Sequence, residues 1–347
     1  MPTSAAPAPR LARRLCAVAA AFALGLSGSA ALVAPAEAHS GRAHGNRAVA
    51  LGDSYASGEG IAPYRAGTDT ATNQCHRSVE AYPELLTDGR RPALKRVRSV
   101  ACSGAGTGAL VADLPDRSSE PPQLDALRRS TKRVTLTIGG NDLGFSQVLG
   151  SCVYTPVNSP ELQRLVPGRP GCRAQDAFVV ARTARLAGAG TAAQFPGTLT
   201  MAEALLAIHS RSPRARVYVT GYPRLIGLTG FDAFGCRVGT LGPAPLYVTS
   251  LDVDWLRKKV DELNAAIQAG VATARSQGVR ATYVDVATPF TTHNVCGSGT
   301  PWVNGVVFTA TNPPQLSIAS FHPNARGQQA YADAVAAAIR ADSRRRN

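Results

Sequence analysis

The stretch AVALGDS, residues Ala48–Ser54, decides the fold. In it an apolar run ends abruptly in a glycine, an aspartate and a serine. The run has the length of a short buried strand, and Gly52 interrupts it. A hydroxyl placed where a strand stops has a rigid support and still faces solvent, as a reactive serine requires. Gly-Asp-Ser also occurs in ordinary turns, so Ser54 becomes a candidate nucleophile only if other segments supply its partners.

Further β-like runs follow the first and alternate with helical stretches. The runs cover 97–101, 133–138, 216–220 and 281–286, and the helical stretches cover 122–129, 200–209, 252–277 and 324–341. This alternation predicts a three-layer α/β/α fold of flavodoxin-like type, with a central parallel sheet of about five strands. In such folds reactive groups gather beyond the carboxyl ends of the strands.

The first 38 residues predict a secretory signal peptide. A basic flank precedes an apolar stretch over 15–33, and a small-residue pattern places the cleavage near Ala38. We therefore expect a secreted, extracellular protein with a single domain over residues 39–347. The alternative is an uncleaved membrane anchor, for which the apolar stretch is long enough.

The cysteine count agrees with export. Six cysteines follow the predicted signal peptide, and an even number in a secreted chain indicates disulfides. Six cysteines permit fifteen pairings. The simplest joins neighbours in the chain: Cys75–Cys102, Cys152–Cys172 and Cys236–Cys296. The Gly/Pro-rich insertions at 151–175 and 229–249 are then expected to be long stapled loops. A zinc site is the rival, but no Cys-x-x-Cys or paired-histidine spacing occurs, and we expect no metal.

The chain is strongly basic, with 37 Lys plus Arg against 23 Asp plus Glu. The basic residues are scattered, and no basic stripe interleaved with aromatic residues occurs. A nucleic-acid partner is therefore not expected. The charge favours contact with an anionic lipid interface or with an acidic polymer such as a plant polyester.

Three later segments supply what a reactive serine needs: a base and donors for an oxyanion. Gly104 follows the second β-like run, and a glycine lets a backbone N–H approach a substrate closely. Asn141 follows the third run and offers side-chain N–H donors, while His322 precedes the last helix and can act as a base. Other nearby side chains have simpler interpretations: Ser103 fits a loop, and His76 decorates one.

These four segments resemble the four blocks of the SGNH (GDSL-type) hydrolase family, in the expected order. The cysteine layout also resembles secreted actinomycete esterases and lipases of that family. The resemblance implies Ser54 as nucleophile and His322 as general base and then acid. It further implies an oxyanion hole formed by the backbone N–H groups of Ser54 and Gly104 and by the Asn141 side chain.

One position departs from the family pattern. The family commonly has Asp three residues before the histidine, and here that residue is Ala319. No Asp or Glu occurs between Asp285 and Asp333. We therefore expect a serine–histidine dyad in which the carbonyl of Ala319 or Ser320 orients the His322 ring. A carboxylate from elsewhere, for example Asp285, is the rival.

The sequence thus predicts a secreted, cofactor-free esterase or lipase, expected to be a monomer, that acts on a small-molecule or lipid ester. Phospholipase A and carbohydrate acetyl-esterase are alternatives within that class. An extracellular binding module on an inactive hydrolase scaffold is the alternative from another class, and it would require a missing reactive group.

Overall fold

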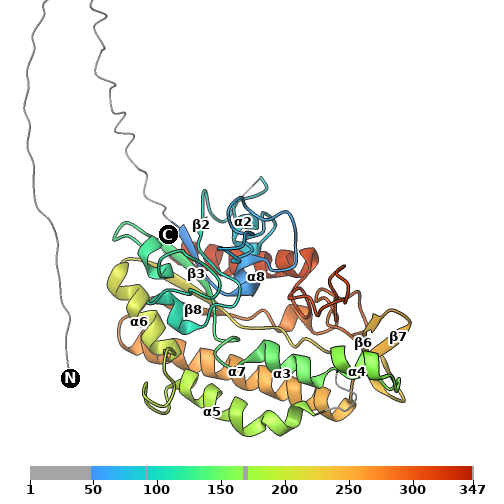
Figure 1. Cartoon of the computed structure of the whole chain (residues 1–347). Coiled ribbons are helices and arrows are strands. Elements are labelled where there is room, and N and C mark those ends of the chain that lie inside the picture. Colours follow the sequence, from blue (N-terminus) through green and yellow to red (C-terminus); the bar gives the residue numbers. More distant parts are fainter. Residues whose placement is uncertain (1–47, 91, 167–170, 346–347) are drawn as a thin grey trace, which may run out of the picture. The chain divides into compact units, whose positions relative to one another are not determined.

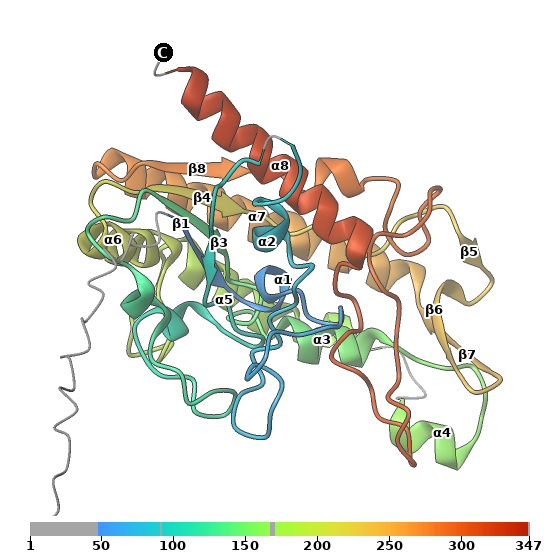
Figure 2. The same cartoon turned by 90° about the horizontal axis from the view of Figure 1, so that it is seen from above.

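A five-stranded parallel sheet runs through the centre of the protein (Figures 1 and 2). The computed structural model describes residues 48–90, 92–166 and 171–345, so the predicted signal peptide over 1–38 lies outside the described residues. In spatial order the strands are β2 (Arg98–Ser99), β1 (Ala48–Gly52), β3 (Arg133–Thr137), β4 (Arg216–Thr220) and β8 (Ala281–Val284). This arrangement confirms the predicted α/β class with a parallel sheet.

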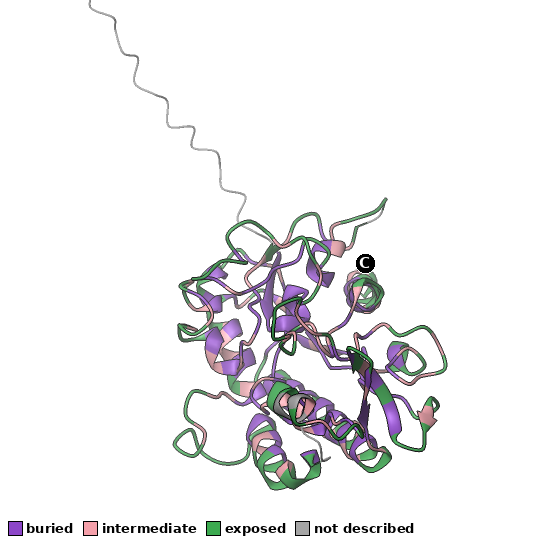
Figure 3. Cartoon of the chain, turned by 45° about the vertical axis from the view of Figure 1, so that its right-hand side comes forward, coloured by how far each residue is buried: buried purple, intermediate pink, exposed green. Residues whose placement is uncertain are grey.

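The central strands are buried on both faces, as a sheet covered by helices requires. Every residue of β1 is buried, and Figure 3 shows the sheet in the colour of buried residues. The ladder pairs Gly52 of β1 with Thr137 of β3. The next ladder pairs Leu136 of β3 with Val219 of β4, so these strands end at the same edge of the sheet.

Helices cover both faces of this sheet. Figure 1 shows α2 (Tyr82–Leu85) and α8 (Ala325–Arg344) above it, and α5 (Asp176–Ala187), α6 (Met201–Arg211) and α7 (Ser250–Ser276) below it. The long helix α7 packs against α5, α6 and β8, while α8 packs against α2, β4 and β8. No helix of the described ranges is long and apolar enough to cross a membrane.

Polar side chains fix where the predicted helices begin. Thr200 caps α6 in a capping box with Glu203, and Thr249 accepts a hydrogen bond from the Asp252 N–H at the start of α7. Asn324 caps α8 by accepting from the N–H groups of Arg326 and Gly327. The last cap lies two residues after His322, so it also fixes where the loop that carries His322 ends.

Two predicted elements have half the expected length or less. The helix predicted over 122–129 is the 3-10 helix Gln123–Ala126, and the strand predicted over 97–101 pairs only at Arg98–Ser99. The Gln123 side chain is bonded to both backbone groups of Gly52, accepting from its N–H and donating to its carbonyl (2.8 and 2.9 Å). These tertiary bonds hold the turn against β1 in place of a longer helix.

The two insertions contain more regular structure than the loops that we predicted. The segment 229–249 forms an antiparallel sheet of β5 (Phe231–Asp232), β6 (Gly235–Leu241) and β7 (Ala244–Val248). The segment 151–175 contains α4 (Pro160–Leu165) and a 3-10 turn, Cys172–Gln175. The remaining short elements are α1 (Ser54–Ser57), α3 (Phe145–Cys152) and the 3-10 turns Thr107–Leu110 and Thr288–Phe290.

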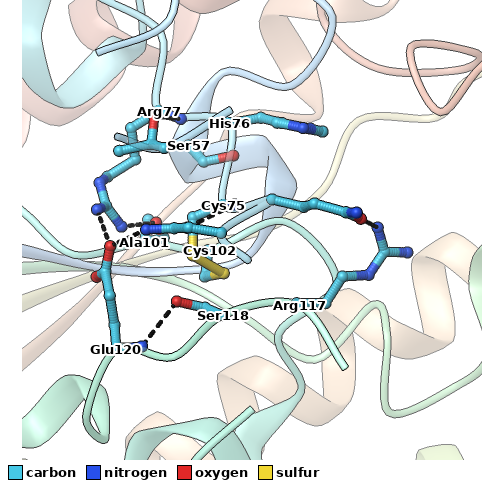
Figure 4. Close-up of a disulfide and its surroundings, with 12 residues drawn as sticks. Ser57, Cys75, His76, Arg77, Ala101, Cys102, Arg117, Ser118 and Glu120 are labelled. Carbon is cyan, nitrogen blue, oxygen red and sulfur yellow. Dashed lines mark hydrogen bonds and ion pairs between the residues drawn. A yellow bond between two sulfur atoms is a disulfide. The ribbon is translucent and has the colours of Figure 1, made fainter. Parts of the chain in front are cut away.

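Disulfides join the six cysteines of the described chain as neighbours: Cys75–Cys102, Cys152–Cys172 and Cys236–Cys296. The Cys102 N–H donates to the carbonyl of Gly52 (3.0 Å), so the first disulfide, drawn in Figure 4, lies at the end of β1. The second ties the end of α3 to the turn before α5, and the third ties β6 to the loop after β8.

Removing a disulfide releases a closed loop in the unfolded chain and so destabilises the fold. We expect the double variant C75A/C102A to lower the free energy of unfolding by about 2–5 kcal/mol, measured by urea denaturation. Thiol titration of the active wild-type protein should find none of the six cysteines free. Two or more free thiols in active enzyme would contradict this pairing.

Candidate functional site

Ser54 lies at the end of the most buried strand, on a turn that only glycine permits. Gly52 has φ +138°, and a Cβ there would overlap the carbonyl oxygen of Thr137. Asp53 then caps α1 by accepting a hydrogen bond from the Tyr55 N–H (2.9 Å). Ser54 is the first residue of this one-turn helix, and its side chain lines a cavity at the carboxyl edge of the sheet.

The structure brings His322 to Ser54. The His322 Nε2 atom lies 2.7 Å from Ser54 Oγ, and Nδ1 lies 3.1 Å from the carbonyl oxygen of Ser320. Of the two carbonyls expected beside the ring, the one at Ser320 is therefore in contact. The Ala319 carbonyl instead accepts from the His322 backbone N–H and the Asn304 side chain (3.3 and 3.1 Å).

The Asp285 carboxylate, expected as the rival partner, is engaged elsewhere. It accepts hydrogen bonds from the Ala287 N–H (2.8 Å) and the Thr288 hydroxyl (2.5 Å), and so closes its own turn. The side chain of Asp285 is exposed. In the part of the chain that the structure describes, no carboxylate contacts the His322 ring.

The backbone beside His322 is held from the opposite end of the chain. Phe321 has φ +59°, and its carbonyl accepts a hydrogen bond from the Tyr55 hydroxyl (2.8 Å). The Tyr55 ring also packs against the His322 ring, with centroids 5.1 Å apart. Burial lowers the pKa of His322, an effect that the negative charge of Glu59 partly opposes. The imidazole is therefore neutral at pH 7 and able to accept a proton.

Three sets of hydrogen-bond donors face the same cavity. Gly104 has φ +84°, and in the described chain neither its backbone N–H nor that of Ser54 donates to a protein acceptor. The Asn141 side chain donates to the Ala105 carbonyl (2.9 Å). An amide group carries two N–H donors, so one fixes the side chain and the other remains for a ligand.

A buried tyrosine, which the sequence analysis did not identify, joins two of these segments. The Tyr222 hydroxyl donates to the Asp53 carboxylate and accepts from the Gly140 N–H (3.0 Å). Burial raises the pKa of Asp53 to about 7, although the bonds from Tyr222 and Tyr55 lower it. Tyr222 follows β4, so the rule that reactive groups follow strand ends could have suggested it.

A second buried carboxylate joins the segments of Gly104 and Asn141. Asp142 accepts hydrogen bonds from the backbone N–H and the hydroxyl of Thr107, the latter at 2.6 Å. Burial raises the pKa of Asp142 to about 6. Neither residue was expected to have a role, because nothing in the sequence shows that positions 107 and 142 meet.

His76 was interpreted from sequence as a loop residue, and the structure shows it buried in a polar pair. Its Nδ1 atom lies 2.7 Å from a carboxylate oxygen of Glu59, which is 1% exposed, and its ring stacks on Tyr64. Burial would raise the pKa of Glu59, but hydrogen bonds from His76 and Ser103 lower it below its usual value. The Ser103 hydroxyl thus bonds to a carboxylate, and no histidine contacts it in the described chain.

The cavity beside Ser54 is lined largely by apolar side chains. Its volume is about 190 Å³, and its apolar lining includes Phe145 and Leu149 from α3, Val260 and Leu263 from α7, and Leu225 and Leu316 from loops. Ser54, Gly104, Asn141 and His322 all line it. Among the described residues, no group of three or more His, Cys, Asp or Glu side chains is placed to hold a metal ion.

Comparisons with known proteins agree with this geometry. The sequence pattern of the GDSL-like lipase/acylhydrolase family matches residues 50–330. A lipase from Streptomyces rimosus is 32% identical over 92% of this chain and 95% of its own, and lipase 2 from Streptomyces coelicolor is 32% identical over 94% and 97%.

Solved structures show the same similarity. The crystal structure of phospholipase A1 from Streptomyces albidoflavus has a TM-score of 0.58 at 29% identity, covering 83% of this chain and 97% of that one. The extracellular lipase from Streptomyces rimosus has a TM-score of 0.57, with the same identity and coverage. The family match spans both Ser54 and His322, and the chain belongs to the GDSL-like lipase/acylhydrolase family.

Proposed function

We propose that this protein hydrolyses carboxylic esters through an acyl-enzyme on Ser54. The observation that carries this proposal is the 2.7 Å contact between Ser54 Oγ and His322 Nε2 at the mouth of an apolar cavity. The neutral His322 takes the proton of Ser54 as the oxygen attacks the ester carbonyl carbon. An inactive binding module would lack this reactive pair.

The hydrogen-bond donors that face the cavity stabilise the negative charge that forms on the ester carbonyl oxygen. When Ser54 adds to the carbonyl, the carbonyl oxygen becomes an oxyanion, which the N–H groups of Ser54, Gly104 and Asn141 are placed to bind. His322 Nε2 then gives its proton to the leaving alcohol as the bond to the acyl carbon breaks. Water, deprotonated by His322, attacks the acyl-enzyme, which releases the acid and returns the proton to Ser54.

The Ser320 carbonyl takes the place of the Asp carboxylate that commonly orients the histidine in this family. It accepts the Nδ1–H of His322, which leaves the Nε2 lone pair facing Ser54. A neutral carbonyl stabilises the imidazolium less than a carboxylate does, but it fixes the same tautomer. This supports a serine–histidine dyad.

The cavity supports an acyl chain longer than acetyl. Its walls carry leucine, valine and phenylalanine side chains, which would bury little apolar surface against a methyl group. Leu316 and Ile318 line the cavity and are 46% and 44% exposed, so apolar surface continues outward from it. These features favour a lipase or phospholipase that works at a lipid interface over a carbohydrate acetyl-esterase.

Secretion is part of the same proposal. The N-terminal signal pattern, the three disulfides and the similarity to an extracellular lipase support export, with cleavage near Ala38 and a single domain over 39–347.

A fluorophosphonate probe should label the folded protein at Ser54, because only a serine activated by a base attacks phosphorus readily. Peptide mapping by mass spectrometry would locate the label. The variant H322A, which lacks the base, should label far more slowly, and the unfolded wild type should not label. A label on Ser57 or Ser103 would overturn the assignment.

The variant N141A should lower kcat by roughly 10²–10³-fold with little change in KM, because the amide acts on charge that develops in the transition state. Steady-state kinetics on p-nitrophenyl esters would measure both constants, and circular dichroism would check the fold. A loss confined to KM would instead place Asn141 in substrate binding.

A further inference from the structure

We infer that Arg117 is an anion-binding subsite that takes the phosphodiester of a glycerophospholipid whose ester carbonyl lies at Ser54. The inference rests on the proposed ester hydrolysis and deepens it by naming the alcohol part of the substrate. It comes from the charge inside the cavity and from where that charge is held.

Arg117 is the one permanently charged side chain among the described residues that line the cavity. The other ionisable groups there are held neutral or paired. His322 has a lowered pKa, and Asp53 is 1% exposed and bonded to Tyr222. The cavity therefore combines apolar walls with a single cation, which is the pattern of an amphipathic anionic ligand rather than a triacylglycerol.

The Arg117 guanidinium has no acidic partner in the described chain. Its one side-chain hydrogen bond is a long one, 3.4 Å from Nη1 to the Gln74 side-chain oxygen. Figure 4 shows the contrast with Arg77, which turns away from Arg117 to form an ion pair with Glu120. Most of the donors of Arg117 remain available, and a guanidinium binds phosphate oxygens by paired hydrogen bonds.

Two acidic groups around His76, which senses the charge of Arg117, are engaged by that histidine. The buried Glu59 lies 2.7 Å from His76 Nδ1, and the Asp69 carboxylate lies 3.4 Å from His76 Nε2. The positive charge of Arg117 in turn lowers the pKa of His76, although the bond to Glu59 raises it overall. Neither carboxylate forms an ion pair with Arg117 in the described chain, which leaves the guanidinium for a ligand.

The arm of Arg117 runs beside the glycine that faces the reacting carbonyl. A Cβ placed on Gly104 would lie 3.1 Å from Arg117 Nε. In a glycerophospholipid only the glycerol carbons separate the ester oxygen from the phosphate. A carbonyl held at Gly104 therefore brings the phosphate within reach of Arg117, whereas a simple alkyl ester presents nothing to it.

The backbone of Arg117 is fixed by the first disulfide and its neighbours. The Arg117 carbonyl accepts a hydrogen bond from the Gln74 N–H (2.7 Å), next to Cys75. Cys75 is bonded to Cys102, two residues before Gly104. The disulfide in Figure 4 therefore holds both the cation and the glycine on one support, as a preformed subsite requires.

The test compares two soluble substrates with the same acyl chains: dihexanoyl phosphatidylcholine, which carries the phosphodiester, and dihexanoylglycerol, which lacks it. The readout is the ratio of their kcat/KM values. R117Q should lower the ratio of phosphatidylcholine to diacylglycerol by about 10- to 100-fold, because the variant loses a charged hydrogen bond that only the phospholipid can form. R117K keeps the charge and should lower the ratio by less. R96Q removes the same charge at an exposed position outside the cavity and should leave the ratio unchanged.

The alternatives give different results. An equal loss on both substrates would mean that Arg117 only supports the Gly104 loop, and it would overturn the subsite. An unchanged ratio would overturn it as well. Dihexanoyl phosphatidic acid carries a phosphomonoester in place of the phosphodiester. If R117Q lowers kcat/KM relative to dihexanoylglycerol for phosphatidic acid but not for phosphatidylcholine, the proposed phosphodiester is overturned in favour of a phosphomonoester.

A binding measurement separates this inference from the proposed function. Glycerophosphocholine should bind the wild type and inhibit it competitively, and R117Q should weaken the binding at least tenfold, measured by calorimetry. If the wild type hydrolyses neither ester but binds glycerophosphocholine through Arg117, the hydrolysis fails and the subsite stands. Hydrolysis of both esters with no effect of R117Q leaves the hydrolysis and removes the subsite.

Discussion

The hydrogen bond between Ser54 and His322 joins residues 268 positions apart, and the rest of the structure is arranged to keep it. Ser54 is fixed by β1, which lies inside the sheet between β2 and β3. His322 lies in a loop just before α8, so its position depends on how α8 packs against α2, β4 and β8. Gln328 of α8 links the two, because its side chain donates to the Tyr55 carbonyl (3.2 Å) and accepts from the Tyr82 N–H (2.8 Å).

The carboxylates near this bond hold the backbone in place. Asp53 is bonded to Tyr222 and Asp142 to Thr107, and burial raises the pKa of both carboxyl groups. Together they connect the segments that carry Ser54, Gly104 and Asn141. The ring of His322 is left with a neutral carbonyl partner, Ser320, and with the more distant charge of Glu59. Buried carboxylates thus hold the backbone of the site, and a backbone carbonyl orients the His322 ring.

The sequence was sufficient to predict the sheet and the residues at its edge. Parallel strands must end together, so Ser54, Gly104 and Asn141 could be placed near one another before any distance was known. The α/β fold was predicted correctly from the alternation of strands and helices, and the GDSL-like family from the resemblance of the four segments to its sequence blocks. The strands β5–β7 were not predicted, because the segment 229–249 is rich in Gly and Pro and because short antiparallel strands leave little periodic signal.

Contacts made by tertiary structure alone were beyond the sequence. Tyr222 bonds to Asp53 across 169 positions, and Gln123 bonds to Gly52 across 71. Neither pair has a local pattern, since each depends on where two loops meet. The same holds for Arg117: the sequence does not show that its guanidinium forms no ion pair within the described chain or that it lies beside Gly104.

We infer that backbone carbonyl groups, and no carboxylate, orient His322, and ¹⁵N NMR of the labelled imidazole tests this inference. The spectrum of the free enzyme at pH 7 should show a proton on Nδ1 and none on Nε2, because Nδ1 faces the Ser320 carbonyl. Titration should give a pKa below the ordinary value of about 6.5, because burial disfavours the charged ring. A proton on Nε2, or a pKa raised above 6.5 and restored to normal by a single Asp→Asn or Glu→Gln change, would show that a carboxylate orients the ring.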